Sequence, residues 1–190
     1  MDDIIHTYTI QWKGPFASYE QLKESCKKRK KRNICTSILF SFYYFSGNKK
    51  WKRGRKFAYF GKHSKFDSIT HRLNPKHEHF CQFHENENLE IWIGSFANTE
   101  YQTDEIIDFV VTIFINSYKD KLNDNDKKTA KPFEDAVREY FVIVNLWYDI
   151  NEKPYKSRSL VPFDDVITYE VVKTEDCMAL LKRKIKEVYN

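Results

Sequence analysis

Apolar and polar residues alternate in several short stretches of the chain, and this alternation predicts β-strands. Residues 6–12, HTYTIQW, form the first stretch, and a turn-forming Gly-Pro pair follows it. Residues 34–45 and 56–63 predict two strands that pair as a hairpin around the turn GNKK. Residues 89–96, LEIWIGSF, are apolar on both faces, which is typical of a central strand covered on both sides.

Helical patterns interrupt these strands. Ser18, with Gln21 three residues later, matches a capping box and predicts a helix over residues 19–28. Thr103 opens the longest helical pattern, residues 105–122, whose apolar residues nearly surround the helix axis. We therefore expect this helix to be buried against the sheet.

The C-terminal part of the chain is predicted to mix helix and strand. Residues 132–150 indicate a short helix that leads into a strand, and residues 159–172 are extended. Thr174 then begins a predicted terminal helix. Its apolar residues share one stripe at helical spacing: Met178, Leu181, Ile185 and Val188.

The composition is that of a folded protein, because 41% of the 190 residues are hydrophobic and 16% are aromatic. A chain of this length forms one domain, or one domain with an appendage. No run approaches the roughly 20 apolar residues that span a bilayer, and the first residues do not resemble a signal peptide. The four cysteines match no disulfide framework. We therefore expect a soluble cytoplasmic protein with no membrane partner.

Positive charge is concentrated in the N-terminal part of the chain. Residues 1–80 hold 18 Lys and Arg against 6 Asp and Glu, a balance of +12, whereas residues 81–190 hold 14 against 21, a balance of −7. This asymmetry is typical of a protein that binds a polyanion, although a basic run is also often only a solvated loop. The predicted nucleic-acid contacts come from the two runs at 27–32 and 49–56: Lys28, Arg29, Lys50, Trp51, Arg53 and Arg55. The Trp51 ring could stack on a base.

Five short sequence features follow one another along the first two thirds of the chain, and their order matches that of a known family of domains. The first hairpin strand contains SFY at 41–43, and the returning strand contains YFG at 59–61. Arg72 lies in a helical segment, residues 89–96 supply a third strand, and Asn123 closes the unit. In this order and spacing the chain resembles the GIY-YIG nuclease domain, and its W-x-G-P opening resembles one branch of that family.

The resemblance covers about residues 8–123. It implies an α+β fold in which a small central, mostly antiparallel three-stranded sheet is flanked by helices. Residues 1–125 would form this core together with the N-terminal strand, helix and basic arm. Residues 126–190 would form a C-terminal α+β extension that packs on the core.

The resemblance implies metal-dependent hydrolysis of phosphodiester bonds in DNA. Tyr43 would orient or deprotonate the attacking water, and Tyr59 would help to position the phosphate. Arg72 would bind the scissile phosphate through its planar guanidinium group. Three further candidates would contact the phosphate or assist proton transfer: Lys62, His63 and His77.

The metal would be one Mg²⁺ or Mn²⁺ per active site, held by a glutamate. In the family this glutamate falls about twelve residues before the closing asparagine, which is Val111 here, and a valine cannot hold a hard cation. Asp108, one helical turn earlier, could replace the ligand, or a longer connection could bring Glu105 into the site. Without either substitute the domain would have lost its metal.

Three functions remain open from the sequence. The first is a metal-dependent DNA endonuclease, acting on double-stranded DNA in preference to single strands. The second is a catalytically impaired nucleic-acid-binding or decoy protein on the same scaffold, and the third is a small basic α+β interaction module unrelated to the family. The acidic C-terminal segment could also mediate a homodimer.

A zinc site is a separate alternative, because five potential ligands fall close together: His71, His77, His79, Cys81 and His84. Their spacing matches no standard zinc module, so a mixture of phosphate-facing and surface histidines is favoured.

Overall fold

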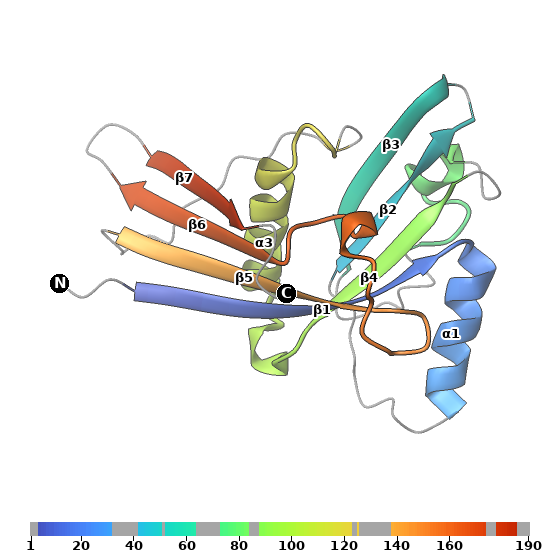
Figure 1. Ribbon diagram of the computed structural model, residues 1–190, viewed down its shortest axis with the longest axis horizontal. Helices are drawn as coiled ribbons and strands as arrows, with labels where there is room; N and C mark the ends of the chain where they lie inside the picture. The colour runs from blue at the N-terminus through green and yellow to red at the C-terminus, as the bar shows by residue number, and fades with distance from the viewer. Residues whose placement is uncertain are drawn as a thin grey trace.

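The computed structural model of the chain describes residues 4–31, 42–50, 52–63, 73–83, 88–122, 125, 138–173 and 178–185. Its strands form one seven-stranded sheet in the order β3-β2-β4-β1-β5-β6-β7 (Figure 1). They are β1 (Ile4–Phe16), β2 (Phe42–Lys49), β3 (Lys52–Lys62), β4 (Glu90–Phe96), β5 (Arg138–Tyr148), β6 (Val166–Lys173) and β7 (Met178–Ile185). The α-helices in these ranges are α1 (Tyr19–Lys31) and α3 (Asp104–Ser117), and short 3-10 turns occur at Phe80–Gln82, Thr99–Tyr101 and Arg158–Leu160.

The long strand β1 joins two halves of the sheet. It pairs antiparallel with β4, where Trp12 lies opposite Gly94, and parallel with β5, where Trp12 lies opposite Trp147. On one side β2 pairs antiparallel with β3 and β4, and on the other β6 pairs antiparallel with β5 and β7. The sheet is therefore mixed, and it curls around α3 (Figure 1).

The predicted fold is wrong in the size and composition of its sheet. Instead of a small three-stranded sheet flanked by helices, the antiparallel trio β3-β2-β4 is one part of a mixed seven-stranded sheet. The strands β5, β6 and β7 continue that sheet through β1. The physical reason is that the second edge of β1 carries backbone N–H and C=O groups, and these find partners when β5 pairs with it.

The predicted terminal helix is also wrong. Residues 178–185 form β7, which pairs antiparallel with β6 from Met178 opposite Lys173 to Ile185 opposite Val166. A short helix is only marginally stable by itself, whereas the open edge of β6 offers a continuous ladder of hydrogen bonds. The tertiary context therefore overrides the apolar stripe at helical spacing.

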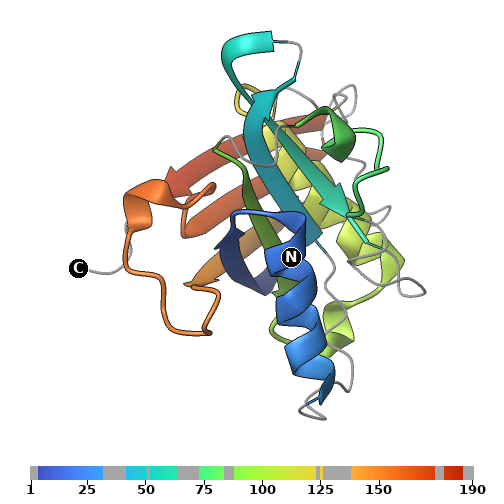
Figure 2. The same cartoon turned by 90° about the vertical axis from the view of Figure 1, so that its right-hand side faces the viewer.

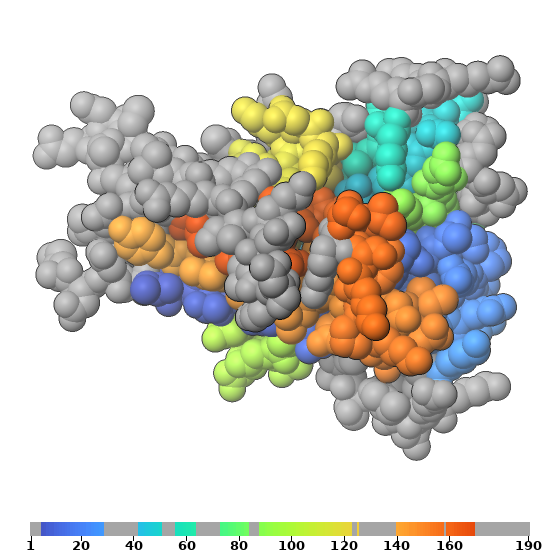
Figure 3. All heavy atoms as spheres, in the orientation of Figure 1, coloured from blue at the N-terminus to red at the C-terminus, as the bar shows by residue number. Residues whose placement is uncertain are grey.

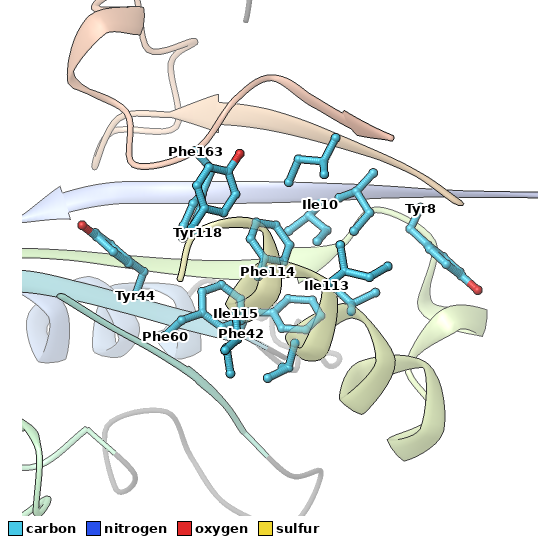
Figure 4. Packing of buried hydrophobic residues seen from close by; sticks show 14 of the residues in the cluster. Tyr8, Ile10, Phe42, Tyr44, Phe60, Ile113, Phe114, Ile115, Tyr118 and Phe163 are labelled. Atoms are coloured by element: carbon cyan, nitrogen blue, oxygen red, sulfur yellow. The ribbon is translucent and has the colours of Figure 1, made fainter. Parts of the chain in front are cut away.

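Large aromatic side chains fill the core between α3 and the sheet (Figure 4). The Thr103 hydroxyl accepts a hydrogen bond from the Ile106 N–H, so the predicted start of this buried helix is confirmed. Phe114 stacks on Phe60 of β3 with ring centroids 4.7 Å apart and contacts the Phe163 ring at 4.8 Å. Burying side chains of this kind contributes about 1.5–3 kcal/mol each to stability.

A buried polar network ties this core together. The Trp12 indole N–H donates to the Asn145 side-chain oxygen at 2.8 Å, and the Asn145 amide donates to the Asp164 carbonyl at 2.7 Å. The Tyr118 hydroxyl donates to the Asp164 carboxylate and accepts from the Asp164 N–H, both at 2.9 Å. These bonds join β1, β5 and the end of α3, and they satisfy polar groups that would be costly to bury alone.

The opposite face of β2, β3 and β4 carries a second apolar cluster, which includes Tyr19 and Leu22 of α1 and Phe80 of the segment 73–83. Figure 2 looks onto this side and shows α1 in front of the strands. The Ser18 hydroxyl accepts from the N–H of Gln21 at 3.2 Å, so the predicted helix start is confirmed. We call this side of the sheet the α1 face, and the side that packs on α3 the α3 face.

Candidate nucleic-acid interface

Tyr43 and Tyr59 lie on the α1 face. Their ring centroids are 6.1 Å apart, and both rings stack with Phe45, at 6.2 Å for Tyr43 and 5.3 Å for Tyr59. Alternation along β2 places the neighbouring Tyr44 on the α3 face, where it packs against Phe163. The structure therefore brings the two predicted tyrosines together, but Tyr43 is fully buried whereas Tyr59 is half-buried.

Gly61 makes room for the Tyr43 ring. The two residues are direct partners in the hairpin, and the ring occupies the space that a Cβ atom on residue 61 would need. An aromatic ring that covers a cross-strand glycine is a known way to fix the register of a hairpin. The glycine in this signature thus has a packing role.

His77 holds the Tyr43 hydroxyl. Its Nε2 lies 3.2 Å from the hydroxyl oxygen, and its Nδ1 accepts a hydrogen bond from the Phe80 N–H at 3.3 Å. A ring nitrogen that accepts carries no proton, so the neutral imidazole must carry its proton on Nε2 and donate it to Tyr43. In this arrangement His77 positions the phenol and cannot take a proton from it through Nε2.

His79 is a further ring of this cluster, and the sequence reasoning assigned it only to the zinc alternative. It stacks on Tyr59 with centroids 4.2 Å apart and an angle of 22° between the ring planes. Its side chain is 28% exposed, and its Nε2 lies 3.5 Å from the Glu78 carboxylate. The H-x-H spacing of His77 and His79 was the available signal, because both rings contact Tyr59.

Asp108 lies on the other face of the sheet. Its carboxylate is 2.6 Å from the Lys62 ammonium. Side chains alternate between the two faces along β3, so Lys62 lies on the same face as Phe60, which is the α3 face. Glu105 is exposed in the first turn of α3. Asp108 is paired with Lys62 and lies on the opposite face of the sheet from Tyr43 and Tyr59. It is therefore not placed to bind a metal beside those tyrosines. The candidate residues therefore do not fit the implied Mg²⁺ or Mn²⁺.

The other predicted site residues are distributed as follows. His63 is buried at the end of β3. Arg72, Trp51 and Asn123 lie outside the described residues, as do His71 and His84 of the zinc alternative. In the ranges that are described, no three His, Cys, Asp or Glu side chains come together as a metal site.

The helix α1, which carries basic residues, packs on the same face of the sheet as the tyrosines. Lys27 and Lys28 are exposed, and α1 lies open on the surface (Figure 3). Lys50 is also exposed, at the turn of the β2–β3 hairpin, where its N–H donates to the Gln82 carbonyl. The predicted contacts Arg29, Arg53 and Arg55 lie in α1 and β3, and their side chains are not among those described.

Asn125, which was not among the predicted site residues, forms hydrogen bonds with the backbone at the outer edge of β3. Its side-chain amide accepts from the Phe60 N–H at 2.8 Å and donates to the Phe60 carbonyl at 2.7 Å. Among the described strands β3 lies at the edge of the sheet, so these backbone groups have no strand partner on that side within the described residues. An asparagine side chain therefore takes the place of a neighbouring strand at this one position.

Comparisons with protein-family models, with curated proteins and with solved structures find no match to this chain. The resemblance to the GIY-YIG domain therefore stays a prediction. Among the described residues, no helix is long and apolar enough to cross a membrane.

Proposed function

We propose that this chain binds nucleic acid through the α1 face of its sheet, as a GIY-YIG-like protein in which metal-dependent cleavage is impaired. The observation that carries the proposal is that α1, a helix with exposed lysines, packs on the face of the sheet where the half-buried Tyr59 and His79 rings lie. Lysines attract the phosphate backbone, and aromatic rings contact bases or sugars. The excess of positive charge in residues 1–80 supports the same partner.

Two placements favour binding over hydrolysis. Tyr43, the candidate that would activate water, is fully buried and accepts a hydrogen bond from His77. Asp108, the candidate metal ligand, is paired with Lys62 on the α3 face. The groups that hydrolysis would need at one phosphate are therefore separated by the sheet.

A DNA endonuclease is the second candidate function. One observation favours it: the Tyr43 phenol, the His77 imidazole and the Tyr59 ring lie in contact, as required for a site that orients a nucleophile near a phosphate. Arg72 would supply the phosphate contact that the family resemblance implies. Cleavage would require that DNA reach Tyr43 and that a metal bind with a ligand set other than Asp108.

Binding is tested by measuring the affinity for a short DNA duplex over a range of salt concentrations. We expect log Kd to depend steeply on log salt, because each lysine–phosphate contact releases counterions. The double variant Lys27→Glu, Lys28→Glu should weaken binding and make the salt slope shallower by about 2. The charge-matched control is Lys119→Glu, Lys121→Glu, in the exposed turn that follows α3. Equal losses in both variants, or binding without salt dependence, would contradict the proposed interface.

Hydrolysis is tested by incubating plasmid DNA with the protein in Mg²⁺ or Mn²⁺ and comparing the products with those formed in a chelator. Impaired cleavage predicts no metal-dependent nicks, together with salt-dependent binding. Nicks that disappear in the Tyr59→Phe and Arg72→Ala variants, while both variants stay folded, would replace the binding proposal with the endonuclease.

A further inference from the structure

We propose that the Lys13 ammonium group is a binding site for a backbone phosphate on the α1 face, and that the Glu152 carboxylate holds this site until a phosphate replaces it. Nucleic acid and Glu152 therefore compete for the same lysine. The inference rests on the proposed nucleic-acid binding, and it adds one phosphate contact and a built-in competitor to that surface.

The register of the sheet places Lys13 on the α1 face. Lys13 lies opposite Ile93 of β4, and Ile93 lies opposite Tyr43 of β2. Residues that are partners in register point to the same face, and Ile93 and Tyr43 both belong to the apolar cluster of the α1 face. Because neighbouring strands are about 4.8 Å apart, the Cα atoms of Lys13 and Tyr43 are about 10 Å apart in one row. Lys13 therefore lies on the same side of the sheet as the predicted site residues.

The loop that follows β5 brings a carboxylate to this lysine. The Glu152 carboxylate lies 3.2 Å from the Lys13 ammonium, and Ile150 of the same loop packs against the apolar cluster of the α1 face. The Lys13 side chain is 9% exposed, whereas that of Glu152 is 53% exposed. A phosphate can therefore approach the pair from the solvent side, and a rotation of the Glu152 side chain would let it replace the carboxylate.

The backbone of the loop indicates that the carboxylate, and not the turn, requires a glutamate. The φ angle of Glu152 is 68°, in the left-handed region that favours glycine or asparagine. The turn is closed by other groups, because the Glu152 N–H donates to the Asp149 carbonyl at 3.0 Å and the Lys153 N–H donates to the Asp149 carboxylate at 2.8 Å. What the glutamate adds to this turn is a negative charge at Lys13.

Stability alone does not account for the pair of Lys13 and Glu152. A buried ammonium is costly unless it is paired, and replacing a buried ion pair with apolar side chains of similar size is often neutral or stabilising. An ammonium beneath a half-exposed carboxylate is instead suited to exchanging one anion for another. Carboxylate and phosphate oxygens both accept short, charge-assisted hydrogen bonds from an ammonium group, so a phosphate can take the same position.

The test measures the affinity for a short DNA duplex over a range of salt concentrations, for the parent protein and for Glu152→Gln. The variant removes the competing charge, so we expect binding to become tighter by about 3- to 10-fold. The slope of log Kd against log salt should become steeper by about 1. The reason is that a phosphate at Lys13 releases a salt ion in the variant, whereas in the parent protein it displaces Glu152.

Three further variants separate this contact from a general effect of charge. Glu152→Gly fits the φ angle and also lacks the carboxylate, so it should tighten binding to the same extent. Glu100→Gln removes an exposed carboxylate from the turn after β4 and should leave the salt slope unchanged. In the double variant Lys13→Met, Glu152→Gln the gain in affinity should disappear, and urea denaturation checks that this protein is folded.

The inference is overturned if Glu152→Gln binds the duplex like the parent protein, if Glu100→Gln tightens binding as much, or if the gain persists in the double variant. Should the double variant not fold, the comparison of Glu152→Gln with Glu100→Gln decides the question. The proposed function fails in a different way, namely if neither the parent protein nor Glu152→Gln shows salt-dependent binding.

Discussion

The α3 face and the α1 face of the same three strands differ in what their aromatic residues do. On the α3 face the rings of Trp12, Phe60 and Phe114 pack into a closed core. On the α1 face Tyr59 and His79 are only partly buried, and α1, which carries exposed lysines, packs on the same face. The comparison teaches that aromatic content alone does not indicate function, because one sheet buries such rings completely on one side and leaves some of them partly exposed on the other.

The largest effect is expected from Trp12→Ala, which removes a fully buried ring from the centre of the α3 face. Its loss leaves a cavity against Trp147 and leaves the Asn145 side-chain oxygen without its donor. We expect the free energy of unfolding to fall by about 3–5 kcal/mol. Urea denaturation measures this. If the free energy of unfolding falls by less than it does when a surface residue is truncated, the α3 face is not the core of the protein.

Buried tyrosines on the α3 face should make the free energy of unfolding depend on pH at high pH. Burial raises the pKa of the Tyr44 phenol to about 12, and burial likewise raises the pKa of Tyr118. The folded state then holds the proton more tightly than the unfolded state, whose phenols titrate near 10. The stabilisation is complete below pH 10 and is lost as the pH rises toward 12, by about 1.4 kcal/mol per pH unit for Tyr44.

Denaturant titrations of the parent and of Tyr44→Phe at several values between pH 9 and pH 12 measure this effect. The variant lacks the ionisable group, so its stability should fall less steeply with pH. Identical slopes for the two proteins would show that Tyr44 is not shielded from solvent on the α3 face.

On the α1 face we expect Gly61→Ala to destabilise the protein by about 1–3 kcal/mol, because the added methyl group must displace the Tyr43 ring. Gly47→Ala is the matched control in the same hairpin, since its Cβ atom would come no closer than 3.3 Å, to the Phe83 ring. Thermal unfolding of both variants tests the claim. Equal melting temperatures would argue against the tight packing of Tyr43 over Gly61.

The smallest effect is expected from Asp108→Asn, which breaks the partly exposed pair with Lys62. Such surface pairs contribute about 0.2–1 kcal/mol, so stability should change little. DNA binding on the α1 face should not change either, because the pair lies across the sheet. A large loss of DNA affinity or of a metal-dependent activity in this variant would restore Asp108 as a functional residue.

The local parts of the fold could be predicted because their causes are local. Ser18 and Thr103 start the two helices with their own hydroxyls, and Glu90–Phe96 form a strand that is covered on both faces. The terminal helix could not be predicted correctly, because an apolar stripe at helical spacing does not reveal that β6 has an open edge nearby.

The residues of the candidate site likewise divide into those that the sequence could indicate and those that only the structure reveals. The sequence pointed to Tyr43, Tyr59 and His77, which the fold brings into contact. It could not reveal that the Tyr43 hydroxyl is bonded to His77, 34 positions away, or that the Phe80 N–H bond to His77 Nδ1 fixes the imidazole tautomer. His79 was missed as a partner of Tyr59 for the same reason, since stacking depends on how the segment 73–83 crosses the strands.

By itself, the sequence determined the charge asymmetry, the helix starts and the fact that neighbouring residues of a strand face opposite ways. Only the tertiary structure decided which face each residue joined, and so separated Asp108 from Tyr59 and made one sheet of seven strands. The physical reason is that capping and alternation are set by residues a few positions apart. The choice of face and of strand partner depends instead on burying apolar surface and pairing backbone groups across the whole chain.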